Sequence, residues 1–211
     1  MMYKDYKKPA YEWLPDIPHH WQELFIQQVS HEQKNRNTGN IEHLVLSLSY
    51  GNIIRKKNVD AGLVAKDLST YQIVDKNNII LRFTDLQNDH KSLRVGLAKE
   101  RGIITSAYLS LRNNSDNLAT YLYYLLHTFD ILKGFYGMGA GVRQGLNWDE
   151  VRSLRIVVPP LAEQQEIADY LDAKCAQIDT LIGKKERLLG ELEAYKKSLI
   201  YECVTGKREA E

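Results

Sequence analysis

The sequence predicts an α+β fold, in which a mixed α/β domain over residues 1–160 precedes one long coiled-coil helix over residues 161–211. Before Pro160, short segments rich in β-branched and aromatic residues alternate with turn residues, which is typical of strands. One segment among them repeats its apolar residues with the period of a helix. No proline follows Pro160, and helix-forming residues dominate to the end of the chain.

Residues 1–40 predict an irregular, kinked entry to the domain. Pro15 and Pro18 lie between the indole side chains of Trp13 and Trp21. Because proline fixes its own φ and restricts the residue before it, this stretch favours extended and turn conformations. We expect the two indole rings to anchor it to the rest of the domain.

Four segments predict strands, at residues 43–51, 78–83, 102–112 and 152–160. Between the last two, apolar residues recur at helical spacing, which predicts a helix within residues 114–135. Ser115 or Asn117 can cap its start, and Gly134 can end it. A glycine-rich loop follows the helix.

The C-terminal helix carries two rows of residues at seven-residue spacing, which interleave at three and four as in a coiled coil. At 1.5 Å per residue, about 40 residues form a rod roughly 60 Å long, too long to bury its stripe on a domain of this size. We therefore expect a homodimer through this helix, or capture by another protein; a helix folded back on its own domain is the alternative. The expected dimerisation residues are Ile167, Leu171, Ile178, Leu181, Leu188, Leu192, Tyr195 and Leu199.

The composition is that of a soluble globular protein, since 44% of the residues are hydrophobic and 26% are charged. No apolar run approaches the ~20 residues of a membrane span and no apolar signal core begins the chain, so we expect a cytoplasmic protein without membrane contact. Cys175 and Cys203 lack metal-ligand spacing and fit a reducing compartment. Residues 1–160 hold 20 Lys and Arg against 16 Asp and Glu, a mildly basic balance that permits phosphate binding without requiring it.

No segment predicts a catalytic centre or a metal site. The glycine-rich loop has a helix before it and a strand after it, the reverse of a dinucleotide-binding loop. The six histidines lack metal-ligand spacing, and His127 in the amphipathic helix is interpreted as structural. Asp85, Asp89, His90 and Lys91 form a local cluster, whereas a nuclease centre draws carboxylates and a lysine from separate strands around a metal. We therefore expect a non-catalytic protein without a metal.

Basic residues interleave with hydrogen-bonding polar residues in the segments 49–57, 82–94, 99–102 and 141–147. Lys and Arg bind phosphate groups, whereas Arg, Asn and Gln also discriminate bases. The same composition occurs on an ordinary hydrated surface, so the pattern indicates a DNA interface without establishing one. The residues that we expect to contact DNA are Arg55, Lys56, Lys57, Arg82, Lys91, Arg94, Arg143 and Gln144.

Four stretches resemble the DNA specificity subunit of type I restriction–modification systems: "EWLPDIPHHW", "RFTDLQNDHKSLR", "AGVRQGLNWDEVRSLRIVVPP" and "PPLAEQQEIADYLD". The resemblance runs nearly from end to end. Family members usually carry two target-recognition domains, separated by two long helices that pair antiparallel, whereas this sequence contains one domain and one helix. The resemblance implies a half-length form, with a DNA-binding target-recognition domain at residues 1–160 and a spacer helix at residues 161–211.

The resemblance also implies that the chain reads one half-site of a bipartite target in double-stranded DNA and recruits a methylation subunit and a restriction subunit. The chain itself would be non-catalytic, while the assembled complex has methyltransferase and endonuclease activity. S-adenosylmethionine and ATP belong to those partners, so the chain needs no cofactor. Pairing of two copies through antiparallel helices would restore two domains, and this symmetry predicts a palindromic, interrupted target.

Two other functions stay open at this point. One is a small metal-dependent nuclease that uses residues 84–91 with a divalent ion. The other is a structural coiled-coil adaptor that does not bind DNA. The length of the chain fits both a natural half-subunit and the truncated product of a two-domain gene.

Overall fold

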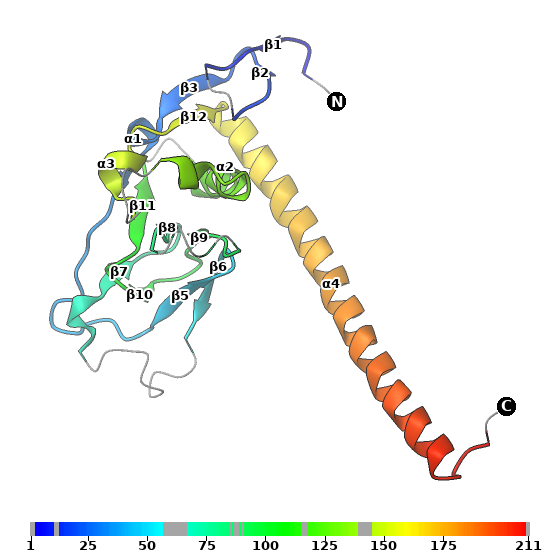
Figure 1. Cartoon of the computed structure of the whole chain (residues 1–211). Coiled ribbons are helices and arrows are strands. Elements are labelled where there is room, and N and C mark those ends of the chain that lie inside the picture. Colours follow the sequence, from blue (N-terminus) through cyan, green and yellow to red (C-terminus); the bar gives the residue numbers. More distant parts are fainter. Residues whose placement is uncertain are drawn as a thin grey trace. The chain divides into compact units, whose positions relative to one another are not determined.

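Antiparallel pairing joins the strands of the first part of the chain (Figure 1). The structure is a computed structural model that describes residues 3–10, 13–56, 67–84, 86, 89, 91–114, 118–138 and 145–209. Within these residues the largest sheet has four strands in the order β4-β11-β8-β9. Their bounds are Ser30–Glu32 (β4), Leu109–Asn113 (β11), Ile79–Leu81 (β8) and Val95–Leu97 (β9).

Four two-stranded sheets accompany this sheet within the described residues. They pair β1 (Tyr6–Lys7) with β2 (Ile17–Pro18), β3 (Gln22–Phe25) with β12 (Arg155–Val158), β5 (Leu46–Ser49) with β6 (Asn52–Arg55), and β7 (Gln72–Val74) with β10 (Gly102–Ile104). A helical turn, α1 (Ile26–Val29), separates β3 from β4. The entry segment is thus less irregular than its sequence predicts, because β3 and β4 gain partners far along the chain.

The expected strands at 43–51, 78–83 and 152–160 contain β5, β8 and β12. The single strand expected at 102–112 is wrong, since this segment forms β10 and β11 with a turn between them. In that turn the Tyr108 N–H donates to the Thr105 carbonyl at 3.1 Å. The reversal lets Ile103 and Leu111 enter two different apolar clusters, which one continuous strand would not do.

The expected helix is confirmed as α2 (Ala119–Ile131). Its N-cap residue is Leu118, whose N–H donates to the side-chain oxygen of Gln164 at 3.0 Å. Ser115 and Asn117, the expected caps, lie outside the described residues. The side chain of Gln164, which is distant in sequence, therefore accepts a hydrogen bond from the backbone at the start of α2.

The end of α2 differs from the prediction that Gly134 terminates it. The left-handed residue after the helix is Lys133, with φ 61°, and Gly134 begins a short 3₁₀ turn, η2 (Gly134–Gly137). Gly134 is needed for a different reason. A Cβ atom there would lie 2.1 Å from the ring of Phe129, so the close packing of turn and helix requires glycine.

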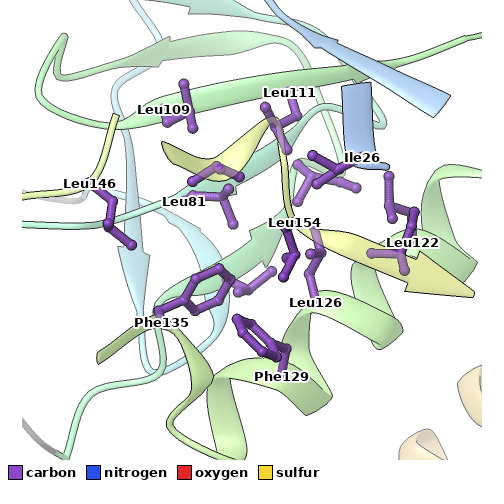
Figure 2. Close-up of a cluster of buried hydrophobic side chains, with 14 of the residues drawn as sticks. Ile26, Leu81, Leu109, Leu111, Leu122, Leu126, Phe129, Phe135, Leu146 and Leu154 are labelled. Carbon is purple, nitrogen blue, oxygen red and sulfur yellow. The ribbon is translucent and has the colours of Figure 1, made fainter. Parts of the chain in front are cut away.

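The main apolar core lies where α2 and η2 pack against strands of the largest sheet and the β3–β12 pair (Figure 2). Leu111, Leu126 and Phe135 are completely buried there. Phe129 and Phe135 meet edge to face, with ring centroids 4.8 Å apart, and Trp13 packs on Phe129 at 5.0 Å. The expected anchoring of the entry segment by Trp13 is confirmed.

Two short helical turns, η1 (Leu68–Thr70) and α3 (Trp148–Val151), precede β7 and β12. The long helix α4 (Leu161–Val204) starts directly after Pro160. In its first turn, Glu163 accepts hydrogen bonds from the Tyr3 hydroxyl at 3.1 Å and the Trp21 indole N–H at 3.0 Å, and it lies 2.6 Å from Nε2 of His20. The expected anchoring role of Trp21 is thus confirmed at the start of α4.

The chain divides into two compact units, which we call the globular unit (Met1–Glu166) and the helical unit (Ile167–Glu211). With 44 residues, α4 is about 66 Å long. Within the described residues of the helical unit no second helix is present. Most of the expected dimerisation stripe is more than half exposed, as shown by Ile178 (54%), Leu188 (54%) and Tyr195 (57%). Coiled-coil pairing of this stripe stays a prediction.

The helices of the described residues include none that is long and apolar enough to cross a membrane.

Candidate nucleic-acid interface

The structure describes five of the eight residues expected to contact DNA. Lys57, Arg143 and Gln144 lie outside the described residues. The remaining five belong to two segments: Arg55 and Lys56 to the β5–β6 hairpin, and Arg82, Lys91 and Arg94 to the loop that connects β8 to β9. We call this loop the 82–94 loop.

Arg55 ends β6 and projects its guanidinium group to the surface. Its side chain is 66% exposed, and its Nε donates to a carboxylate oxygen of Glu100 at 2.7 Å while a second N–H reaches the other oxygen. The hydrogen bond from Arg55 lowers the pKa of Glu100. Water screens an exposed pair of this kind, so a phosphate group can compete with Glu100 for Arg55. Lys56 follows, half-exposed, with its N–H bonded to the Val45 carbonyl at 2.9 Å.

The 82–94 loop carries two basic side chains at its surface. Arg82 donates from Nε to the Thr84 hydroxyl at 3.3 Å and lies 4.0 Å from a carboxylate oxygen of Asp89. Lys91 is exposed, and its backbone N–H donates to Asp89 at 3.2 Å. Both residues are therefore placed where they can meet a phosphate group, although their contact with DNA stays a prediction.

Asp89 holds the turn at the end of this loop. Hydrogen bonds from the hydroxyl and backbone N–H of Ser92, together with the N–H of Lys91, lower the pKa of Asp89 to about 2. Three donors satisfy this carboxylate, as in a capped turn. These hydrogen bonds give Asp89 a structural role in the 82–94 loop.

The structure places Arg94, which we expected to contact DNA, in the interior of the globular unit. Arg94 is completely buried, so its guanidinium group has no surface to offer a ligand. A charged side chain this deep is stable only if its donors are used. It donates to the carbonyl groups of Arg82 at 3.2 Å and Thr84 at 2.9 Å, and to the carbonyl group of Asp89 at 2.5 Å.

Arg94 thus supports the 82–94 loop from inside. Tyr136 adds to this support, since its hydroxyl accepts from Nε of Arg94 at 3.1 Å and donates to the Asp89 carbonyl at 2.9 Å. The buried carboxylate of Asp130 accepts from the backbone N–H of Arg94 at 2.5 Å, and burial raises the pKa of Asp130. Sequence reasoning missed both partners, because they lie on α2 and η2, far from the loop in sequence.

The β5–β6 hairpin and the 82–94 loop lie next to each other. A Cβ atom at Gly51, in the hairpin turn, would lie 3.4 Å from Leu93 of the loop and 3.2 Å from His127 of α2. His127 is half-buried, and burial lowers its pKa, in keeping with the structural role expected for it. The fold therefore brings two of the four basic segments to one region of the globular unit.

No group of three or more His, Cys, Asp or Glu side chains within the described part of the chain is placed to hold a metal ion. Asp85 and His90, which the alternative nuclease site would use, lie outside that part.

A family model described as the type I restriction modification DNA specificity domain matches residues 94–189. The match begins at the buried arginine of the 82–94 loop, covers the remainder of the globular unit and continues into the helical unit. No curated protein matches the chain.

Solved structures share the fold. A structure titled as the structural basis of complex assembly and conformational transition of the type I R-M system is 15% identical, with a TM-score of 0.63, over 93% of this chain and 48% of that one. The HsdS subunit from Thermoanaerobacter tengcongensis is 16% identical, with a TM-score of 0.55, over 83% of this chain and 41% of that one. The type I restriction–modification S subunit from M. genitalium is 15% identical, with a TM-score of 0.51, over 77% and 41%. The chain spans less than half the length of each, and the predicted α+β fold with its long C-terminal helix is confirmed.

Proposed function

We propose that the chain is the non-catalytic subunit through which a type I system recognises one half-site in double-stranded DNA, because a family model described as the type I restriction modification DNA specificity domain matches residues 94–189. The single observation that supports this most is the extent of that match, which includes the strand β12 and continues into the long helix α4. In this proposal residues 1–160 read the DNA and the helix from Leu161 onward sets the distance to the second half-site.

The exposed stripe of the helical unit supports a dimer, which recognition of two half-sites requires. Leu181, Leu188 and Leu192 are each more than half exposed, and apolar side chains at heptad spacing are stabilised by burial against a second helix. Antiparallel pairing of two copies places two globular units in a two-fold arrangement. A two-fold protein favours a palindromic target whose half-sites are separated by a fixed spacer.

The methylation and restriction subunits complete the proposal as partners. The first would supply methyl transfer and the second endonuclease activity, so the chain itself contributes recognition. Its neutral-to-basic globular surface, with Arg55, Arg82 and Lys91 on the hairpin and the loop, supplies cations for DNA phosphates.

A selection experiment tests the recognition role. The full chain, alone and with the methylation subunit of its own system, is incubated with a pool of double-stranded DNA that contains a randomised segment, and the bound DNA is sequenced. The expected result is one enriched, interrupted palindrome. An unenriched pool would favour the adaptor alternative, and magnesium-dependent cleavage by the isolated chain would favour the nuclease.

Oxidative crosslinking tests the dimer. Cys175 and Cys203 are four heptads apart, so an antiparallel pair centred near Leu189 places Cys175 beside Cys203 of the other copy. Mass spectrometry of the oxidised protein is expected to find bonds between 175 and 203. Bonds between two copies of Cys175 alone would contradict this register.

A further inference from the structure

The β5–β6 hairpin is a short two-stranded ribbon on the globular unit (Figure 1). Tyr50 and Gly51 connect its strands, with φ of 44° and 81°. Two consecutive left-handed residues form the turn whose twist matches that of a two-stranded ribbon. The turn therefore closes the hairpin without any additional loop residue.

The inner face of the hairpin is fixed to the domain. Leu46 and Leu48 are each 4% exposed. Leu48 and Ile53 pack so closely on β9 that a Cβ atom at Gly96 would lie 2.5 Å and 2.9 Å from their methyl groups. The glycine makes room for both side chains, so the ribbon is held as part of the packed domain.

The outer face of the hairpin differs from the inner one in chemistry. The register pairs Ser47 with Ile54 and Ser49 with Asn52, which places these four side chains on one face. Asn52 is exposed and Ile54 is 47% exposed. Asn and Ser can hydrogen-bond to base edges, and an apolar side chain can contact the methyl group of thymine. This face thus presents the side-chain types that distinguish bases.

Tyr50 at the tip has a backbone conformation that is unfavourable for tyrosine. Its φ of 44° lies in the left-handed region, which suits Gly, Asn and Asp and strains a tyrosine. Its side chain is nevertheless 68% exposed, so packing in the domain does not explain it. Strain of this kind concentrates at functional sites.

Charge and size favour DNA as the ligand. The segment from His43 to Lys57 contains three Lys and Arg residues and no Asp or Glu. The 82–94 loop, in contrast, contains Asp85 and Asp89 beside its three Lys and Arg residues. Two strands about 5 Å apart fit the major groove, which is about 12 Å wide and admits a two-stranded ribbon.

We infer that the β5–β6 hairpin enters the major groove of the target, with Tyr50 at its tip and the face formed by Ser47, Ser49, Asn52 and Ile54 against the base edges. Arg55 and Lys56, at the open end of the ribbon, contact the adjacent phosphate groups. This inference rests on the proposed recognition of DNA and names the element that distinguishes sequences.

The test compares base preference with total affinity, by the same selection from a randomised duplex pool. The variants are Tyr50→Asn, which keeps a residue that tolerates the turn, and the double variant Ser49→Ala/Asn52→Ala. Each is expected to lower discrimination at one or two positions of the enriched motif roughly 10- to 100-fold. Binding to an unrelated duplex is expected to change less than about twofold, since phosphate contacts supply non-specific binding.

The matched control is Asn77→Gly, which alters another left-handed turn residue, with φ of 70°, between β7 and β8. It is expected to select the wild-type motif. If the hairpin variants, with wild-type melting temperatures, also select that motif at unchanged ratios, the inference is overturned while the proposed function stands. If the wild-type protein enriches no motif, the proposed function itself fails.

Discussion

The globular and helical units differ in how far their apolar side chains are buried. In the globular unit, Ile26, Leu81 and Leu126 have no exposed surface. In the helical unit, Leu188 and Leu192 are each 54% exposed, although each belongs to one of the two rows at heptad spacing. The first unit buries its apolar side chains within itself, whereas the second leaves an apolar stripe exposed, which we propose is covered by a partner helix.

This difference predicts that substitutions in the two units affect different properties of the protein. Changes in the core of the globular unit should alter its unfolding and leave association unchanged. Changes in the stripe of the helical unit should alter association and leave the unfolding of the globular unit unchanged.

The largest effect is expected for Leu188→Glu/Leu192→Glu. A two-fold dimer loses four buried leucine side chains, each worth about 1.5–3 kcal/mol, so the dimer dissociation constant should rise at least ~1000-fold. Sedimentation equilibrium measures it. The control Ala194→Glu lies off the stripe and should leave the constant nearly unchanged. A wild-type chain that sediments as a stable monomer would remove the contrast between the two units.

The next effect concerns the buried guanidinium group. Arg94→Met leaves the carbonyl groups of Arg82 and Thr84 without their donor, and this should cost about 3 kcal/mol of unfolding free energy. Urea denaturation of the full chain measures the loss. Arg112→Met, at an exposed position of β11, should cost less than about 0.5 kcal/mol. Equal losses in the two variants would show that Arg94 does not support the loop.

A smaller effect is expected where the hairpin meets β9. Gly96→Ala introduces a methyl group 2.5 Å from Leu48, which should destabilise the globular unit by about 2 kcal/mol. The control is Gly145→Ala, since the nearest atom to a Cβ there lies 4.0 Å away. Thermal unfolding followed by circular dichroism compares the two. An unchanged melting temperature for Gly96→Ala would mean that the hairpin does not pack tightly against β9.

The smallest effect is expected for Glu163→Gln and depends on pH. Burial alone would raise the pKa of Glu163, but hydrogen bonds from His20, Trp21 and Tyr3 outweigh it and hold the pKa below the ordinary value of 4.5. The carboxylate therefore stabilises the folded state above about pH 4.5, and this contribution is lost as the pH falls through the lowered pKa. At pH 7 the variant should lose about 1 kcal/mol.

Unfolding of wild type and Glu163→Gln between pH 3 and 7 measures this difference, which should shrink below pH 4.5. A difference that stays constant with pH would assign the loss to packing.

Local patterns were enough to predict part of this fold. The alternation of Leu44, Leu46 and Leu48 predicts the strand that becomes β5, and the heptads of α4 predict its long helix. Strands β3 and β4 show no such pattern, because what makes them strands is pairing with β12 and β11. Pairing between distant segments is not visible in a local window.

The candidate interface was predicted less well, for an identifiable reason. Sequence patterns show charge but not burial, so Arg55 on the surface and Arg94 in the interior were interpreted alike. The hairpin turn did carry a signal, because a glycine between two alternating segments is typical of a tight turn. The strain at Tyr50, in contrast, becomes visible only with the backbone dihedral angle.

The way in which Arg94 supports its loop has a consequence for how the protein can change. Its acceptors at Arg82 and Thr84 are main-chain oxygen atoms, which every amino acid possesses. Replacing the side chains of that loop leaves these anchor points intact. Laboratory libraries, or natural drift, can therefore replace the side chains displayed on that loop while the scaffold beneath keeps its shape.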